Sequence, residues 1–375
     1  MVTEKLGNLF RVRSGDGISI ADLSAFGTYP VYGGNGINGY TSDFNVGNET
    51  MVIGRVGEKC GNVNITQSRS WVSDNALIVT PRIKYDIGYM SYLLEKINLN
   101  GYANRNAQPV ISGQIVYAIE TPYVEDIEEQ EVIAQNLFSF DVYITDLSEL
   151  IEKKRGIRNG ALDDLISGRT RINGFCSERK EYAISDITRN IITGGTPSTA
   201  RQEYYDGNIP WLSSTEIHQK RITKPTTYIT DLGLQNSSAK IAPERSVLIA
   251  LAGQGKTRGT AAYLTKPMAI NQSLAALVTN EKCNSEFLYY LIESMYLSLR
   301  ELSSGDGGRG GLNKKLIKEV VVTIPVDVAE QEAIASTLTV MDDEIEALEA
   351  EREKMIQIRE GAMDDLLTGR VRLKV

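Results

Sequence analysis

The chain has 375 residues, of which 42% are hydrophobic and 23% charged, and its formal net charge is −8. This length and balance are typical of a globular protein of two or three domains, and no apolar run approaches the 18 or more residues that a membrane span needs. The single histidine, His218, argues against a histidine metal site or a Ser–His triad. The three distant cysteines, Cys60, Cys176 and Cys283, indicate reduced thiols, so with no signal sequence or membrane span we expect a cytoplasmic protein.

The first segment, residues 1–124, predicts a head of mixed secondary structure. Short β-branched strands are expected at 50–53 and 76–80, between turns rich in glycine and asparagine, and an amphipathic helix is expected at 88–96. Strands mixed with a helix, without a strand–helix–strand period, indicate an α+β domain. The polar loop at 32–36 is of the kind that binds ligands.

Residues 125–172 predict one long helix. Asp126 and Glu129 have the spacing of a capping box, in which the aspartate caps an amide three residues on and the glutamate reaches back. Gly168 is placed to end the helix, and Arg169 and Arg171 follow it beside the negative end of the helix dipole. Apolar residues recur at spacings of three and four, as in a coiled coil of about 40 residues and roughly 60 Å, namely at Ile133, Leu137, Phe140, Ile144, Leu147, Ile151, Ile157 and Leu165.

Residues 173–325 predict a second α+β head. Strands are expected at 246–251, 274–278 and 319–324, and one helix is expected at 286–302. A long glycine-rich loop at 303–311 follows that helix.

Residues 326–375 repeat the long helix. Residues 328–373 align with 127–172 without a gap, with 21 of 46 positions identical, and Asp327, Glu330 and Gly369 repeat the caps. Its apolar positions match the first stripe and include Ile334, Leu338, Met341, Ile345, Leu348, Met355, Ile358 and Leu366. Fainter matches between the heads indicate an internal tandem duplication. We therefore expect two heads separated by two helices that pack as an antiparallel, pseudo-twofold coiled coil.

Acidic charge is concentrated on the two helices. Residues 124–168 carry 11 acidic and 4 basic side chains, and residues 326–368 carry 13 and 3, which leaves a net charge of +9 on the rest of the chain. This distribution favours nucleic-acid contacts by the heads and protein contacts by the helices, although acidic helices are also simply well solvated.

Two motifs suggest enzymatic nucleotide chemistry. Residues 250–257 match a relaxed phosphate-binding loop ending in Lys256 and Thr257, but a strand rather than a helix is expected after it. Gly305, Gly307 and Gly310 have dinucleotide-binding spacing between a helix and a strand, which is the reverse of the required order. The acidic pairs at 163–164 and 364–365 favour contact with another chain over catalysis. An NTP-driven enzyme using Lys256 and a scaffold that binds only proteins remain the alternatives to a DNA-binding protein.

The run at 193–198, Thr-Gly-Gly-Thr-Pro-Ser, and that at 205–211, Tyr-Asp-Gly-Asn-Ile-Pro-Trp, resemble the opening of a target-recognition domain in specificity subunits of Type I restriction–modification systems. The Glu-Gln pairs at 129–130 and 330–331, with the Gly-Arg-x-Arg endings, resemble that family's conserved spacer helices. The resemblance covers essentially the whole chain. The first head departs from it, with Ser-Gly-Asp-Gly at 14–17 in place of Thr-Gly-Gly-Thr-Pro.

The resemblance implies a non-catalytic subunit in which target-recognition domains at 1–124 and 173–325 each read half of a bipartite double-stranded DNA target. Spacer helices at 125–172 and 326–375 would set the gap between half-sites. Two adenine-methylating subunits that carry S-adenosylmethionine, and restriction/translocase subunits that use ATP and Mg²⁺, would be the partners, so no cofactor is expected in this chain.

Candidate DNA contacts are loop residues able to bind phosphates or base edges. In the first head they are Asn35, Asn38, Arg55, Lys59 and Arg69. In the second head they are Thr196, Ser198, Arg201, Ser213, Ser214, Lys256, Arg258 and Arg309. Tyr204, Tyr205 and Trp211 are expected to pack rather than to contact bases.

Overall fold

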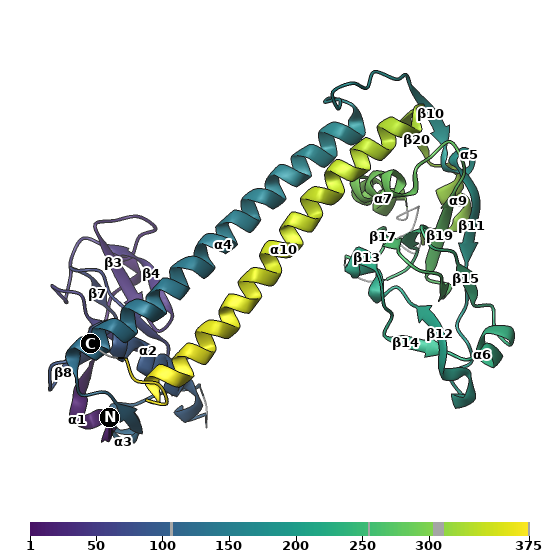
Figure 1. Ribbon diagram of the computed structural model, residues 1–375. Helices are drawn as coiled ribbons and strands as arrows, with labels where there is room; N and C mark the ends of the chain where they lie inside the picture. The colour runs from purple at the N-terminus through teal and green to yellow at the C-terminus, as the bar shows by residue number, and fades with distance from the viewer. Residues whose placement is uncertain (106–107, 254–255, 303–310, 374–375) are drawn as a thin grey trace. The chain divides into compact units, whose positions relative to one another are not determined.

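The computed structural model describes residues 1–105, 108–253, 256–302 and 311–373 (Figure 1). The chain divides into two compact units, each with one head and a part of both long helices. Unit 1 comprises Met1–Leu150 and Leu348–Val375, and unit 2 comprises Ile151–Ala347. The mixed α/β architecture with two long helices agrees with the predicted fold class.

The head of unit 1 is built on a four-stranded sheet of order β2-β8-β5-β6 and a three-stranded sheet of order β4-β3-β7. A two-stranded ribbon pairs β1 with β9 in antiparallel register. The strands are β1 Val2–Lys5, β2 Phe10–Ser14, β3 Tyr29–Gly33, β4 Gly36–Thr41, β5 Met51–Gly54, β6 Val63–Ile65, β7 Trp71–Val72, β8 Ala76–Pro81 and β9 Glu120–Tyr123. The helices are α1 Leu6–Leu9, η1 Ile20–Asp22, α2 Ile87–Ile97, η2 Leu99–Tyr102 and α3 Gly113–Ala118.

The head of unit 2 repeats this plan with additional strands. Its sheets have the orders β11-β19-β16-β17-β13 and β14-β12-β18-β15, and β10 pairs with β20. The strands are β10 Arg179–Ala183, β11 Thr188–Thr193, β12 Tyr205–Leu212, β13 Arg221–Ile222, β14 Thr227–Ile229, β15 Lys240–Ala242, β16 Val247–Ala250, β17 Ala261–Leu264, β18 Met268–Ile270, β19 Leu274–Thr279 and β20 Val321–Pro325. The helices are α5 Ile184–Ile187, η3 Gln202–Tyr204, η4 Glu216–Gln219, α6 Asp231–Gln235, α7 Ser285–Ser294, α8 Tyr296–Leu302 and α9 Lys314–Glu319.

Four of the predicted strands lie within one residue of the observed β5, β8, β16 and β19. The prediction of strand from residue 319 was too long, because α9 continues to Glu319 and β20 begins at Val321. The single helix expected at 286–302 is also wrong, since α7 and α8 are separated at Met295, whose N–H donates to the carbonyls of both Leu291 and Ile292.

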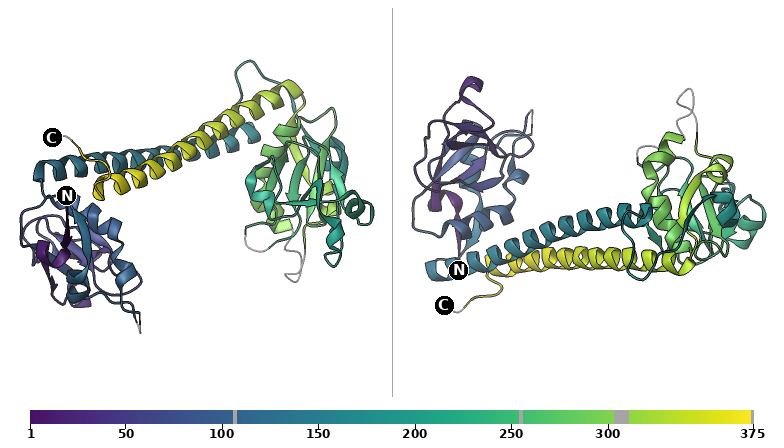
Figure 2. Two further views of the ribbon diagram at one scale, coloured as in Figure 1. Left: turned by 60° about the horizontal axis from the view of Figure 1, so that its bottom comes forward. Right: turned by 90° about the horizontal axis from the view of Figure 1, so that it is seen from above.

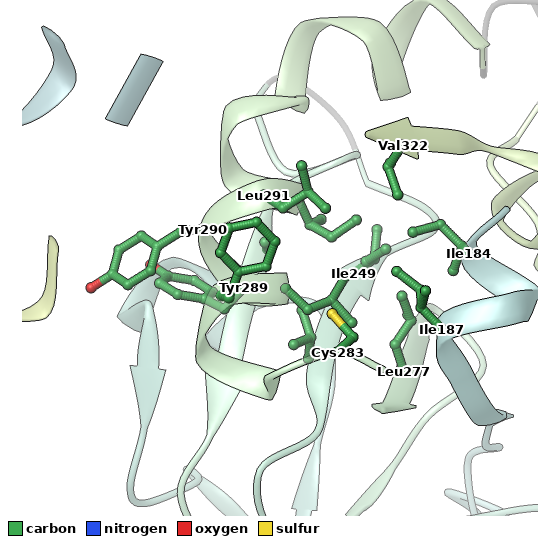
Figure 3. Close-up of a cluster of buried hydrophobic side chains, with 14 of the residues drawn as sticks. Ile184, Ile187, Ile249, Leu277, Cys283, Tyr289, Tyr290, Leu291 and Val322 are labelled. Carbon is green, nitrogen blue, oxygen red and sulfur yellow. The ribbon is translucent and has the colours of Figure 1, made fainter. Parts of the chain in front are cut away.

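Each unit has its own apolar core, in which one amphipathic helix covers the larger sheet. In unit 2, Tyr289, Tyr290 and Leu291 of α7 gather with Ile249 and Leu277 of the sheet (Figure 3). In unit 1, α2 supplies Tyr89, Met90, Leu93 and Leu94 to the corresponding core. Cys60 and Cys283 are buried in these cores and Cys176 is exposed, all three as free thiols. No helix in the described ranges is long and apolar enough to cross a bilayer.

The long helices are α4 Ile127–Ser167 and α10 Val328–Leu367, which lie side by side (Figures 1 and 2). Gly168 and Gly369 have φ values of 78° and 71°, which confirms the predicted left-handed ends. The predicted capping boxes are wrong in detail. Asp126 and Asp327 accept from amides two residues on, those of Glu128 and Ala329.

The glutamates of the predicted capping boxes bind arginines instead. In unit 1, Glu129 accepts from Arg372 Nε at 2.7 Å, and in unit 2, Glu330 accepts from Arg171 Nη2 at 2.7 Å. Their side chains are 3% and 0% exposed, and a charge-assisted bond to a guanidinium is stronger than one to a backbone amide. Because Arg372 donates to it, the pKa of Glu129 is lowered. In each unit these contacts join the end of one long helix to the start of the other, as antiparallel packing requires.

The coiled-coil stripe is interrupted at one equivalent position in each helix. Ile157 and Ile358, both predicted to be apolar seam positions, are 52% and 42% exposed. The arginines that follow them turn inward, and the side chain of Arg158 is only 5% exposed. The strict three-and-four spacing therefore fails where the helices meet the heads.

The inward arginines join both helices to a head. In unit 2, Arg158 binds Asp342 of α10 at 2.9 Å and Glu293 of α7 at 2.6 Å. Its guanidinium lies over the ring of Tyr290, whose hydroxyl donates to the same Asp342. Burial alone would lower the pKa of Arg158, but its two carboxylate partners outweigh burial and raise it.

Unit 1 has the same contact between both long helices and the head, made by the helix residues equivalent to those of unit 2 at the repeat's offset of 201. Arg359 binds Asp141 of α4 at 2.5 Å and Glu95 of α2 at 3.1 Å, and it lies over Tyr92, which donates to Asp141. A buried glutamine adds a further contact, since Gln130 accepts from the amide of Asp86, the residue that caps α2. The duplication has therefore preserved the attachment of each head as well as the long helices.

Candidate nucleic-acid interface

In unit 1, the structure brings several predicted polar residues together where strands of the two sheets end. Arg55 follows β5 and donates to Ser14 Oγ at 3.1 Å, and Asn35, in the β3–β4 turn, accepts from Asn62 Nδ2 at 3.3 Å. A Cβ at Gly54 would lie 2.2 Å from the carbonyl oxygen of Gly34, so only glycine allows the two loops to approach so closely. The loops around 14, 35, 55 and 62 thus form one polar group.

The other candidates of unit 1 lie around this group or apart from it. Lys59 is exposed in the loop between β5 and β6, and Asn38 is exposed on β4. Arg69 lies in a separate loop with a left-handed φ of 57°, and its guanidinium stands 5.7 Å from the ring centre of Phe44.

In unit 2, the Thr-Gly-Gly-Thr-Pro segment is held tightly against the second sheet. A Cβ at Gly194 would lie 1.7 Å from the carbonyl oxygen of Ile270, which explains the glycine. Trp211 Nε1 donates to the Gly195 carbonyl at 3.2 Å, and Tyr205 donates to the Pro197 carbonyl at 2.6 Å. Tyr204 is buried, and Tyr205 and Trp211 pack against a small apolar cluster, so the three aromatic residues pack within the head as expected.

The polar residues of this segment face outward. Thr196 is exposed and donates to Gln272 Oε1 at 2.8 Å, and Ser198 is exposed. Arg201 is also exposed, pairs with Glu203 at 3.1 Å and lies over the ring of Tyr204.

The hydroxyl of Ser213 serves an internal contact. Together with Thr226, it donates to Glu216, which is 4% exposed, at 2.9 Å and 2.5 Å respectively. Burial opposes ionisation of Glu216, but the hydroxyl and amide donors outweigh burial and lower its pKa. Ser214, next to Ser213, is half-buried. This buried carboxylate fixes the turn that follows β12.

The Lys256 loop is anchored through its backbone. The carbonyl of Lys256 accepts from Tyr296 Oη at 3.0 Å and from Thr260 Oγ1 at 2.8 Å, while its side chain is exposed. A turn and then β17 follow Lys256, so the strand–loop–helix geometry of a phosphate-binding loop is not formed. Arg258 in this loop is half-buried. Arg309 and the glycine pattern at 305–310 lie outside the described residues.

Three neighbours of the candidate residues were not predicted. Gln272 bonds to Thr196, Asn62 bonds to Asn35, and His218 Nε2 lies 3.2 Å from Thr257 Oγ1 in the Lys256 loop. Each comes from a segment distant in sequence, and no spacing pattern marks it. In the described ranges, no group of three or more His, Cys, Asp or Glu side chains is arranged to hold a metal ion.

Three of the four carboxylates in the acidic pairs at 163–164 and 364–365 form ion pairs within the chain. Asp164 pairs with Arg169 at 2.8 Å, Asp365 pairs with Arg370 at 3.1 Å, and Asp364 pairs with Lys96 of α2. The expectation that the acidic pairs contact another chain stays a prediction.

The architecture is that of a duplicated protein with two heads attached to a pair of antiparallel helices. The family model for the Type I restriction modification DNA specificity domain matches residues 1–155 and again 177–357. The chain therefore belongs to this family.

Individual relatives agree with that assignment. The chain is 31% identical over 153 residues to the Type I restriction enzyme EcoprrI specificity subunit of Escherichia coli, which is 40% of this chain and 38% of that subunit. It is 29% identical over 180 residues to the Type I restriction enzyme MjaIX specificity subunit of Methanocaldococcus jannaschii, which is 47% of this chain and 40% of that subunit. Each of these two matches thus spans less than half of the relative's length. The putative type I specificity subunit S.MpnORF638P of Mycoplasma pneumoniae is 22% identical over 96% of this chain and 94% of its own length.

Among solved structures, the Type-I restriction-modification system S subunit from M. genitalium has the same fold. It superposes with a TM-score of 0.70 at 18% identity, over 98% of this chain and 96% of that one. A chain from a structural study of complex assembly and conformational transition of the type I R-M system superposes with a TM-score of 0.59 at 15% identity, over 99% and 98%.

Proposed function

We propose that this chain is the non-catalytic DNA-specificity subunit of a Type I restriction–modification enzyme. Each head reads one half of a bipartite duplex target, and α4 and α10 set the gap between the halves. The single observation that carries the proposal is the duplication itself. The duplication keeps the helix–head contacts of Arg158 and Arg359, while the loops of the two heads differ. This is expected if the helices have a constant structural role and the two heads recognise different DNA sequences.

The DNA contacts are assigned to the exposed polar loops of each head. Lys59 and Lys256 are exposed cations suited to phosphate oxygens. Amides and hydroxyls at Asn35, Asn38, Thr196 and Ser198 have the donor and acceptor groups that base edges recognise. Three arginines make local contacts and could exchange them for a DNA base edge or phosphate, namely Arg55, Arg69 and Arg201. Ser213, Ser214 and Arg258 are less exposed and would support the loops.

The spacing role follows from the continuity of the helices. α4 is unbroken from Ile127 to Ser167 and contributes to both units, as does α10. A change of length in both helices would therefore move one head along the duplex relative to the other, at about 1.5 Å per residue.

Protein partners are assigned to the helices. Both helices are acidic and carry exposed apolar side chains, including Phe138 on α4 and Val340 on α10, which are 61% and 64% exposed. Two methyltransferase subunits would dock there and supply S-adenosylmethionine chemistry, and restriction/translocase subunits that use ATP would join the complete enzyme. This chain itself is proposed to hold no cofactor.

Methylation mapping tests the proposal. Cells that carry the cognate methyltransferase subunit are sequenced by a long-read method that detects N6-methyladenine, with and without this chain. The proposal predicts adenine methylation at one split motif with a fixed gap only when the chain is present. Assembly of the chain with the methyltransferase subunit without any new methylated motif would favour a scaffold role instead.

A further inference from the structure

A groove of about 660 Å³ lies between α2 and α4 in unit 1. Its apolar lining includes Ile65, Ala134 and Phe138, and four carboxylates also line it, those of Asp86, Glu95, Glu131 and Asp141. Among the described residues, Glu131 forms no ion pair, and it is exposed. Glu95 and Asp141 share Arg359, and Asp86 caps α2, whereas Glu131 has no cation partner in the described ranges. The groove thus combines an apolar wall with more carboxylates than cations.

The equivalent place in unit 2 is filled by an arginine of that unit's own head. Arg221 donates to Glu286 Oε1 at 3.0 Å and to Thr339 Oγ1 at 2.7 Å. Its guanidinium lies 5.2 Å from the ring centre of Tyr263 and 6.0 Å from that of Tyr289. The equivalence is fixed by the junctions, because Tyr92 and Glu95 of α2 make the same contacts as Tyr290 and Glu293 of α7.

In unit 1 the residues that hold Arg221 are replaced by different ones. Glu286 and Tyr289 of α7 correspond to Gly88 and Ser91 of α2, and Thr339 corresponds to Phe138. These replacements leave the space open and place an exposed aromatic ring beside it, which is a suitable face for a guanidinium.

The strand that carries Arg221 also has no counterpart in the described part of unit 1. In unit 2, β13 is the edge strand and pairs in parallel with β17, where the Lys220 carbonyl accepts from the amide of Tyr263. In unit 1, β6 stands in the place of β17, with Ile65 at the position of Tyr263, and in the described ranges no strand pairs with its outer side. Such an edge presents backbone donors and acceptors to another chain.

We propose that the β6 edge and the adjoining groove bind an extended segment of a second protein that carries an arginine followed by an aliphatic residue. The segment adds in parallel to β6, as β13 adds to β17, and its arginine enters between α2 and α4. Strand addition supplies main-chain hydrogen bonds, and the groove supplies specificity for the cationic side chain. The four carboxylates around the groove outnumber their one cation, Arg359, and so repel phosphate, which favours a protein over a nucleic acid as the partner. The inference does not depend on DNA recognition by the heads.

The probe is a fluorescein-labelled nonapeptide with the chain's own sequence Ile217–Pro225, which contains Arg221 and Ile222, titrated into the full-length protein and followed by anisotropy. A second peptide has glutamine in place of the arginine. Saturable binding of the first peptide, with slower hydrogen exchange at the amides of Val63–Ile65, is the expected result. The glutamine peptide is expected to bind at least about threefold more weakly, since it loses a charge-assisted contact.

The duplication provides a matched control on the protein side. Glu131→Gln is expected to weaken binding of the arginine peptide about threefold, and Phe138→Ala to weaken it further, while Glu332→Gln, the same change at the equivalent position of unit 2, leaves binding unchanged. No saturable binding, or equal effects of Glu131→Gln and Glu332→Gln, would overturn the proposal. Because all three variants retain the candidate DNA contacts, their DNA affinity shows separately whether the proposed recognition function holds.

Discussion

Arg158 on α4 and Asp342 on α10 form a two-pronged ion pair, with Nε–Oδ1 and Nη2–Oδ2 distances of 2.9 and 3.1 Å. The duplication places the same pair, Arg359 and Asp141, in unit 1. Each arginine also binds a glutamate of the helix that covers its head's main sheet. The orientation of a head on the helices is therefore fixed by an arginine shared among three elements.

Loss of this arginine should be costly in unit 2. Arg158→Ala removes a buried guanidinium and leaves the partly buried carboxylates of Asp342 and Glu293 without it, so we expect the free energy of unfolding to fall by about 3 kcal/mol. Arg155→Ala removes an exposed pair with Glu152 on the same helix and should cost less than about 1 kcal/mol. Urea denaturation of the two variants measures the difference. Equal losses would mean that the junction is no more important than a surface pair.

Acid should weaken the protein through carboxylates whose pKa is lowered by folding. The pKa of Glu216 is lowered because its hydroxyl and amide donors outweigh burial. A carboxyl group whose pKa is lower in the folded than in the unfolded protein stabilises the folded state when the pH is above the unfolded pKa of about 4.3. This stabilisation is lost as the pH falls through the folded pKa. Thermal melting of wild type and Glu216→Gln between pH 3 and pH 7 (roughly the range that spans these values) should show a smaller acid-induced decrease in the variant. A parallel decrease in both would show that Glu216 contributes nothing to acid sensitivity.

Two glycine substitutions should act in opposite directions. A Cβ at Gly194 would meet the Ile270 carbonyl oxygen at 1.7 Å, so Gly194→Ala should destabilise unit 2 by about 1–3 kcal/mol. Gly160 lies within α4 with no atom within 4 Å of its Cβ position, so Gly160→Ala should stabilise the protein by about 0.5–1 kcal/mol. Chemical denaturation measures both. Stabilisation by Gly194→Ala would refute the close approach of its segment to β18.

The two long helices could largely be predicted from the sequence, but the arrangement of the candidate DNA-binding loops could not. Caps, periodicity and the gapless repeat located both long helices to within a few residues, because these signals are local. Periodicity failed at Ile157 and Ile358, since the inward position there is taken by an arginine whose partners lie on other elements. The partners of Glu129 and Glu330 also lie far away in sequence. The loop groups and the unfilled groove depend on which segments the fold brings together, and no spacing rule reveals that.

Substitution of the loop lysines tests the assignment of phosphate contacts. Lys256→Ala and Lys59→Ala should each weaken binding of the assembled complex to duplex DNA regardless of sequence. Each should also reduce the slope of log K against log salt concentration by about one. Lys153→Ala, which removes the same charge from the exposed face of α4, should leave affinity and slope unchanged. If all three variants behave alike, the effect is one of net charge and the loops are not the interface.

Under the proposed function, α4 and α10 set the distance between the two DNA-recognition heads. The most direct measurement is long-read methylation mapping with a chain carrying about four extra helical residues in each helix, one insertion between Leu150 and Ile151 and the other between Ala347 and Leu348, where the units divide. We predict methylation at the same two half-sites as the unaltered chain, separated by a longer gap, since four residues add about 6 Å. Methylation at the same half-sites with an unchanged gap would show that α4 and α10 do not set the spacing.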